Sequence, residues 1–192
     1  MNGRIILVNG PPRVGKDTVG NALALEIGGT VEKLAKELKE RTHALYCLFE
    51  LNGSPLRHDW FEKSKDRPMD EFRGLTPRDA YIAVSEQYLK PMHGEDILGH
   101  LLLERLQGRE KLLGGVCRWI ITDSGFQQEA EVLETYYGSN HCMLVRLHRE
   151  GCNFEGDSRG YIDLSHLGVR CLDVDNNRAV EDAVADILLE LP

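Results

Sequence analysis

Short apolar runs alternate along this chain with longer segments in which apolar residues recur at helical spacing. The first run, residues 4–9, has the length and composition of a strand buried in a parallel sheet. Apolar residues then recur at helical spacing until Gly28 and Gly29 end the pattern, at Val19, Ala22, Leu23 and Ile27. The pattern therefore predicts a strand, a loop and a helix in that order.

The next part of the chain is predicted to contain one helix and one loop. Residues 31–50 carry leucines at helical spacing, which predicts an amphipathic helix ending in a turn at residues 52–55. Residues 56–74 are charged and poorly periodic, and this indicates a surface loop.

Two further helices are predicted before the middle of the chain. The stretch Thr76-Pro77-Arg78-Asp79 has the residue types of a helix start, and the helical pattern continues up to Pro91. A second helix is predicted over residues 95–106, with Gly108 ending it.

The second half of the chain predicts the rest of an α/β fold. Strands are predicted at 116–123, 141–148 and 170–174, and helices at 126–137 and 178–189. Residues 149–166 are polar and glycine-rich without a clear period, as in a lid. The alternation predicts a single domain over 1–192, with a parallel sheet flanked by helices in three layers. Asp123 stands at the C-terminal end of its strand, the edge at which such sheets bind ligands.

Composition narrows the class of partner. The chain has 192 residues, of which 42% are hydrophobic, and this suits one globular domain. Its formal net charge of −8 argues against a nucleic-acid polymer or an anionic membrane as a partner. Its five cysteines are irregularly spaced without a C-x-x-C pair, as expected of reduced thiols in a cytoplasm. The apolar run at residues 5–8 is too short for a signal peptide or a membrane span.

Residues 10–18, with the sequence GPPRVGKDT, are a near match to the phosphate-binding pattern G-x-x-x-x-G-K-[ST]. Strand, glycine loop and helix follow in the order that this pattern requires. The loop would turn backbone N–H groups toward an anion, and Lys16 would bring an ammonium group to the outer phosphates. The predicted nucleotide-binding residues are Gly10, Arg13, Val14, Gly15, Lys16, Asp17 and Thr18. The competing interpretation is a glycine-rich turn that only joins a strand to a helix.

Asp17 departs from the pattern, because a serine or threonine normally follows the lysine and binds magnesium. In this chain the hydroxyl moves one place on, to Thr18. A carboxylate also binds Mg²⁺, directly or through water, so Asp17, Thr18 and Asp123 are the candidate metal ligands. How Asp17 and Thr18 divide this role stays open.

The rest of the sequence favours a small-molecule kinase over other nucleotide-binding proteins. The N-K-x-D motif that reads guanine in GTPases is missing from the sequence. A long stretch rich in basic and aromatic residues separates the first helix from Asp123, and a second arginine-bearing loop comes later. A kinase needs such an arrangement, with one pocket for the acceptor and a flap that excludes water.

Four segments resemble the bacteriophage-type deoxynucleoside monophosphate kinases, a branch of the P-loop nucleoside monophosphate kinases. These are the G-x-x-x-x-G-K-D-T loop, residues 34–40 (LAKELKE), residues 75–79 (LTPRD) and residues 123–130 (DSGFQQEA). The resemblance implies the three-layer P-loop kinase fold with an acceptor-binding insertion at about 31–110 and a lid at about 149–166. It also implies transfer of the γ-phosphoryl group of ATP to a deoxynucleoside monophosphate with Mg²⁺, and it makes a homodimer plausible.

The resemblance also implies roles for individual residues. Lys16 would neutralise the outer phosphates, and Asp123 would hold magnesium or its water. Lys39 and Arg78 would grip the acceptor phosphate, with Lys65 and Arg73 as further candidates. Arg149 and Arg159 would close over the transferring group. The aromatic residues that could stack on a base are Trp60, Phe61, Phe72 and Tyr81.

One departure from the family and several alternatives remain. The family commonly has an arginine shortly after the strand-end Asp123, where this chain has Ser124-Gly125. Lys39 could be a solvated charge, Arg78 a helix-start residue paired with an acid, and Asp123 a helix cap. The alternative functions are another small-molecule P-loop kinase, such as one for a coenzyme precursor, or a nucleotide-binding protein without turnover.

Overall fold

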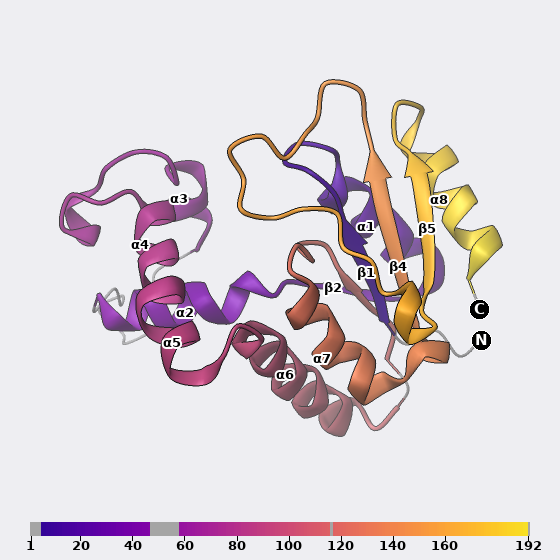
Figure 1. Cartoon of the computed structure of the whole chain (residues 1–192), viewed down its shortest axis with the longest axis horizontal. Coiled ribbons are helices and arrows are strands. Elements are labelled where there is room, and N and C mark those ends of the chain that lie inside the picture. Colours follow the sequence, from indigo (N-terminus) through magenta and orange to yellow (C-terminus); the bar gives the residue numbers. More distant parts are fainter. Residues whose placement is uncertain (1–4, 47–57, 116, 192) are drawn as a thin grey trace. The chain divides into compact units, whose positions relative to one another are not determined.

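A computed structural model describes residues 5–46, 58–115 and 117–191 of the chain, and Figure 1 traces its elements. They divide into two compact units, one formed by residues 1–34 and 99–192 and the other by residues 35–98. The second unit lies within the stretch of about 31–110 that was expected to form the acceptor-binding insertion. Each unit is described by itself below.

The first unit is built on a five-stranded parallel sheet with the order β2-β3-β1-β4-β5. Its strands are β1 (Ile5–Asn9), β2 (Thr30–Glu32), β3 (Trp119–Ile121), β4 (Cys142–His148) and β5 (Arg170–Asp175). Its main helices are α1 (Lys16–Ile27), α7 (Gln127–Tyr137), α8 (Val180–Glu190) and α6 (Ile97–Leu113) from Gly99 onward. The predicted α/β class, with a parallel sheet flanked by helices, is confirmed.

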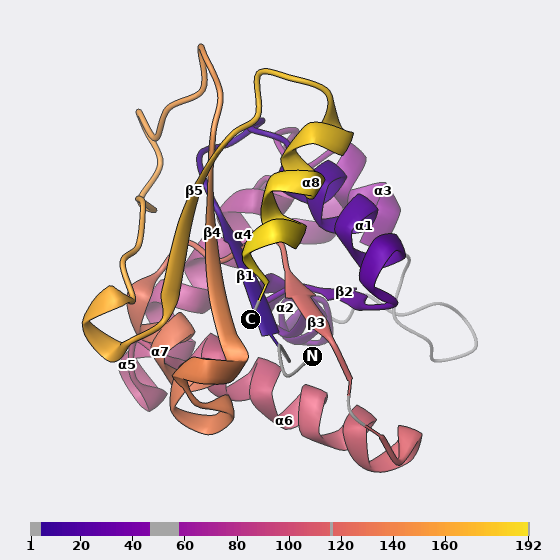
Figure 2. The same cartoon turned by 90° about the vertical axis from the view of Figure 1, so that its right-hand side faces the viewer.

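Helices cover both faces of this sheet, and alternate residues of each strand face opposite sides. Ile6 and Val8 of β1 join a core with apolar residues of α1 and α8, while α6 and α7 lie on the opposite side (Figures 1 and 2). There the indole of Trp119 and the hydroxyl of Tyr137 both donate hydrogen bonds to Glu110, at 2.9 and 3.0 Å. The result is the three-layer arrangement expected from the sequence.

The other unit holds α2 (Ala35–Leu45), α3 (His58–Lys63), the 3₁₀ turn Asp70–Phe72 and a long interrupted helix. This helix consists of α4 (Pro77–Val84), a π-helical turn (Ser85–Leu89) and α5 (Lys90–His93). The predicted N-cap is confirmed, because the Thr76 side chain accepts a hydrogen bond from the backbone N–H of Asp79 at 3.0 Å.

Several predicted elements need correction. Residues 30–32 form strand β2, so the helix predicted from residue 31 begins only at Ala35. Its predicted end near residue 50 and the turn at 52–55 lie outside the described residues. Gly108 does not end α6, which continues to Leu113 because a glycine inside a helix costs only about 1 kcal/mol. The helix that starts at Thr76 also passes Pro91 and ends at His93.

The interpretation of residues 56–74 as a surface loop is wrong for the described part, residues 58–74, which contains α3, a 3₁₀ turn and two core residues. Phe61 and Phe72 are fully buried, with ring centroids 5.1 Å apart, and both pack against the ring of His43. Tyr81 completes this aromatic core, and its hydroxyl lies 2.9 Å from Nε2 of His43. Phe61 and Phe72 are therefore core residues and cannot stack on a base.

We expect Phe61→Ala to lower the free energy of unfolding of the unit by about 3 kcal/mol or more, because it leaves a cavity in the aromatic core. The neighbouring Trp60 is 48% exposed, so Trp60→Ala is the matched control and should cost about 1 kcal/mol or less. Urea unfolding followed by circular dichroism measures both. Equal losses in the two variants would contradict the burial of Phe61.

Candidate functional site

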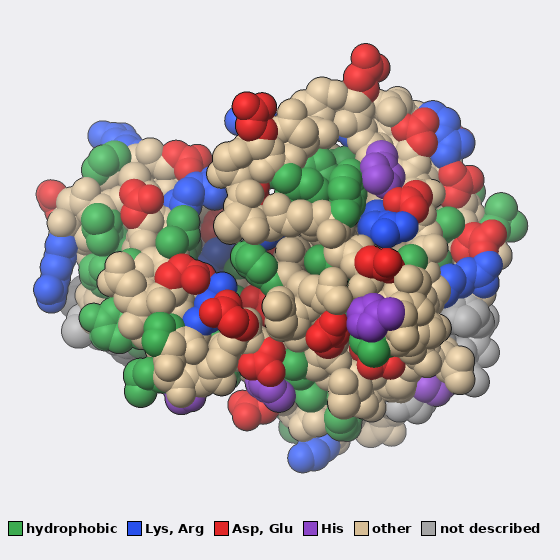
Figure 3. All heavy atoms as spheres, viewed as in Figure 1, with side chains coloured by type: hydrophobic (Ala, Val, Ile, Leu, Met, Phe, Trp, Pro, Cys, Tyr) green, Lys and Arg blue, Asp and Glu red, His purple; other side chains and the backbone are tan. Residues whose placement is uncertain are grey.

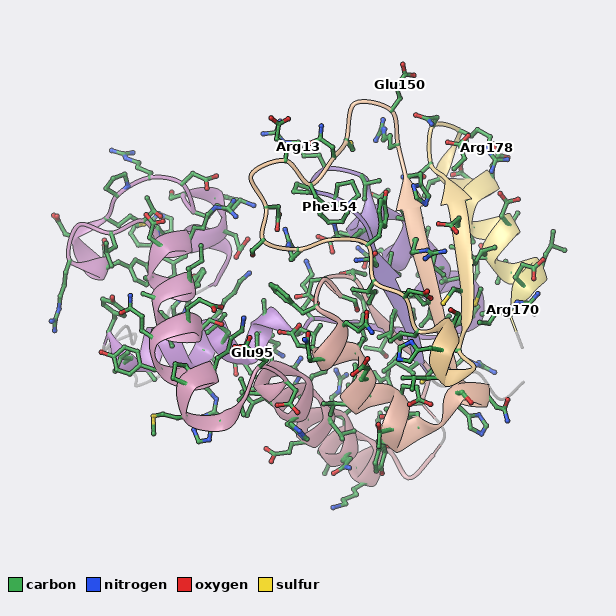
Figure 4. All side chains as sticks on the ribbon, in the orientation of Figure 1. Arg13, Glu95, Glu150, Phe154, Arg170 and Arg178 are labelled. Carbon is green, nitrogen blue, oxygen red and sulfur yellow. The ribbon has the colours of Figure 1, made fainter. Side chains whose placement is uncertain are left out.

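Residues 10–18, called the phosphate loop below because they match the phosphate-binding pattern, run from the C-terminal end of β1 into the first turn of α1, as predicted. Gly15 has a φ of 101°, and a Cβ added to it would lie 2.6 Å from the amide nitrogen of Asn176. Only glycine fits there, because the position combines a left-handed backbone with this close approach. Arg13 also has a positive φ, of 66°, and its side chain is exposed (Figure 4).

Lys16 folds back over the loop. Its Nζ donates hydrogen bonds to the backbone oxygens of Gly10 and Pro11, at 2.6 and 2.8 Å. Burial, and then the positive charge of Arg159, lower its pKa from 10.5 to about 8, although Asp17 and other carboxylates act in the opposite direction. A phosphate group beside this partly buried ammonium would favour its charged form.

Asp17 is held on both sides. One carboxylate oxygen accepts a hydrogen bond from the Thr122 hydroxyl at 2.6 Å, and the other accepts one from Lys33 at 2.8 Å. Its pKa is lowered by these partners, although burial acts in the opposite direction. Asp123 follows Thr122 at the end of β3, and its Oδ1 accepts a hydrogen bond from the backbone N–H of Leu34 at 2.8 Å. Thr18 lies exposed in the first turn of α1.

Asn9 is a central residue that the sequence interpretation missed. Its fully buried side-chain amide donates to the backbone oxygens of Ser124, at 2.8 Å, and of Gly160, at 3.0 Å. Its Oδ1 accepts from the backbone N–H of Ile162 at 3.3 Å. One side chain therefore ties the end of β1 to the loop after β3 and to the predicted lid.

Asn176, also missed, supports the phosphate loop from the turn between β5 and α8. Its buried amide donates to the backbone oxygen of Val14 at 2.6 Å, and its own N–H donates to the backbone oxygen of His148 at 2.8 Å. A polar turn residue after a strand is the only sequence signal that this position carries.

The predicted lid, residues 149–166, contains no helix or strand up to the 3₁₀ turn Ser165–Leu167. Arg149 is exposed next to Glu150, which points outward at the tip of the segment (Figure 4). Phe154 packs edge-on against Tyr161, with ring centroids 5.0 Å apart. Arg159 is partly buried and forms a two-pronged ion pair with Asp157, at 2.8 and 2.6 Å.

The candidate acceptor residues all belong to the unit of residues 35–98. Lys39 is mostly buried, forms an ion pair with Glu62 and lies over the ring of Tyr81. Arg78 is half exposed and pairs with Asp66 at 2.7 Å, as the helix-start alternative anticipated. Lys65 and Arg73 are exposed, and Arg73 occupies a left-handed turn with a φ of 56°.

Asp17 and Asp123, both in the first unit, have the donor chemistry that a magnesium ion prefers. The described residues contain no group of three or more side chains that could bind a metal by themselves. Mg²⁺ is commonly held by one or two carboxylates together with substrate phosphates, and Asp17 and Asp123 are two such carboxylates.

On the face shown in Figure 3, acidic and basic side chains are intermixed rather than gathered in one basic surface. No helix in the described part of the chain is long and apolar enough to cross a membrane.

Comparison with known proteins gives only distant structural similarities. Neither a protein-family model nor a curated protein sequence matches the chain. Among solved structures, a gluconokinase from Sinorhizobium meliloti 1021 is 15% identical, with 99% of this chain and 91% of that one covered and a TM-score of 0.42. A dephospho-CoA kinase from Campylobacter jejuni is 10% identical, with 97% of this chain and 96% of that one covered and a TM-score of 0.45. A shikimate kinase from Aquifex aeolicus vf5 is 16% identical, with 97% of this chain and 95% of that one covered and a TM-score of 0.42.

We expect ATP binding to weaken above pH 8, because free Lys16, with a pKa of about 8, must regain its proton to pair with the phosphates. At pH 9 binding should take up about one proton, and the affinity should fall about tenfold per pH unit. Titration calorimetry at pH 7 and 9, in buffers of different ionisation enthalpy, measures the uptake. Lys16→Met should abolish it. A wild-type protein that takes up no proton at pH 9 would contradict this account of Lys16.

Proposed function

We propose that this chain transfers the γ-phosphoryl group of ATP to a (deoxy)nucleoside monophosphate, giving ADP and a nucleoside diphosphate. The observation that carries the proposal is the grouping of Lys16, Asp123 and Arg159 at the C-terminal edge of the sheet, where their charges act on one another. A turn that only joined a strand to a helix would need none of these groups. Phosphoryl transfer needs both charge signs, to bind the phosphates and to bind their metal.

In this proposal the protein contributes positioning and charge. The N–H groups of the phosphate loop and the ammonium of Lys16 bind the triphosphate, and Arg159 stabilises charge on the transferring group. Bound Mg²⁺ would neutralise phosphate charge, with Asp123 and Asp17 as the residues that hold it. Both oxygens of Asp17 already accept hydrogen bonds, which favours contact with the ion through water, and Thr18 offers the hydroxyl.

The acceptor is assigned to the unit of residues 35–98 by chemistry and resemblance. Lys39 and Arg78 each stand in a segment that resembles the phage-type kinases, and each forms an ion pair whose cation a phosphate could compete for. A nucleoside monophosphate offers a dianion, and a guanidinium can bind it with two parallel hydrogen bonds. We further propose small-molecule nucleotides as the chain's substrates, with a homodimer as its assembly.

The test is a panel of nucleoside and deoxynucleoside monophosphates, incubated with ATP and Mg²⁺ and followed by ADP release. We expect turnover of at least one of them, and Lys16→Ala should remove about 3 kcal/mol or more of transition-state stabilisation. Circular dichroism controls for folding of the variant. Turnover with another small-molecule acceptor alone, such as a coenzyme precursor, would make the chain a different P-loop kinase. ATP binding without any turnover would identify a nucleotide-binding protein.

We expect Arg78→Ala to weaken binding of the acceptor by about 2 kcal/mol, while the KM for ATP stays nearly constant. Stability should change little, because the ion pair with Asp66 is half exposed and worth about 1 kcal/mol or less. Steady-state kinetics with each substrate varied in turn measures the effect. Arg78→Lys is the control, and it should recover only part of the loss because it keeps the charge without the planar fork.

The prediction for Arg78 has a clear opposing result. If Arg78→Ala raised only the KM for ATP, or mainly lowered the melting temperature, Arg78 would act on the donor side or in the fold. Lys39, Lys65 and Arg73 would then be tested in the same way.

A further inference from the structure

Gly125 lies buried in the loop after β3, directly beneath the side chain of Arg159. A Cβ added to Gly125 would lie 2.8 Å from Cγ and 3.1 Å from Cβ of Arg159, and closer still to Cδ. Carbon atoms in proteins pack at about 3.5–4.0 Å, so any larger residue would push the stem of Arg159 away. The stem of Arg159 thus occupies the space that a side chain at position 125 would need.

The guanidinium end of Arg159 is fixed as well. It donates to both carboxylate oxygens of Asp157, and its backbone N–H donates to Oδ1 of the same residue at 3.0 Å. These bonds lower the pKa of Asp157 to about 2 and raise that of Arg159, so both groups stay charged at neutral pH. The side chains of Arg159 and Asp157 are only 29% and 16% exposed.

The backbone beside Arg159 is held from beneath. Asn9 accepts from the N–H of Ile162 and donates to the backbone oxygen of Gly160, the residue that follows Arg159. The same amide of Asn9 donates to Ser124, the residue before Gly125. Asn9, the last residue of β1, therefore holds the neighbours of both contacting residues, Ser124 beside Gly125 and Gly160 beside Arg159. The phosphate loop begins at the next residue.

We propose that Gly125 is a positioning residue, whose lack of a side chain lets Arg159 rest on the loop after β3 and stand at the phosphate loop before nucleotide binds. The catalytic part of this inference rests on the proposed kinase function. Arg159 would then reach the transferring group without a large rearrangement of residues 149–166, because its stem packs on Gly125, its guanidinium is paired with Asp157, and Asn9 binds the backbone that follows it.

The first experiment measures the position of Arg159 without any need for activity. Limited trypsin digestion of the full chain without nucleotide should cleave the bond between Arg159 and Gly160 slowly in the wild type and at least about tenfold faster in Gly125→Ala, where the stem is displaced. Cleavage after Arg149, on the same segment, is the internal reference and should not change. Gly108→Ala is the control, because nothing lies within 4 Å of its added Cβ, its φ is not positive, and it leaves the bond after Arg159 unchanged.

The second experiment is a double-mutant cycle on turnover. Gly125→Ala should lower kcat about 10- to 100-fold with little change in the KM for ATP, since a catalytic group moves by about the width of an atom. In an Arg159→Ala background the same substitution should have almost no further effect, because no stem remains to be displaced. A merely structural role of Gly125 would lower kcat by the same factor in both backgrounds.

Each result decides the inference. Unchanged cleavage after Arg159 in Gly125→Ala, equal acceleration in Gly108→Ala, or additive losses in the cycle would overturn it. Faster cleavage confined to Gly125→Ala supports it, and non-additive losses support it further. If the wild type proves to lack phosphoryl transfer, the proposed function fails on its own, whereas the trypsin result still decides whether Gly125 positions Arg159.

Discussion

The candidate site depends on one buried amide, that of Asn9. A fully buried side chain of this kind must find partners, because an unsatisfied polar group costs about 1–3 kcal/mol. Asn9 finds them on the loop after β3 and on residues 160–162, which are distant in the sequence and meet at the end of β1. The phosphate loop begins at the next residue, so its surroundings are set by the same contacts.

The charges around the loop are balanced in a way that favours an anionic ligand. Burial, and then the nearby charge of Arg159, lower the pKa of Lys16, while Asp17, Asp157 and Asp123 act in the opposite direction. Lys16 donates hydrogen bonds to two backbone oxygens of the loop. A phosphate group beside Lys16 and Arg159 would favour the charged form of the lysine and reduce the repulsion between the two cations.

Local signals explain what the sequence predicted correctly. The phosphate loop, the cap at Thr76 and the apolar strands β1 and β4 are each specified by neighbouring residues, so their spacing suffices. Strand β2 has only three residues and forms because it pairs with β3. So short a strand gives no pattern of its own, and its residues were assigned to the helix that follows. Phe61 and Phe72 sit in short, charged segments, where burial depends on α2 and α4 rather than on any period.

The same distinction between local signals and long-range contacts applies to the candidate site. The position of residues 10–18 between a strand and a helix was predictable, whereas the contacts of Asn9, of Asn176 and of Gly125 with Arg159 join residues far apart in the sequence and leave no local pattern. Gly125 illustrates why. The sequence shows only a glycine after Ser124, whereas in the fold the side chain of Arg159 fills the space beside this glycine. Such a site cannot be judged one position at a time, because the space at residue 125 and the position of the charged side chain at residue 159 depend on each other.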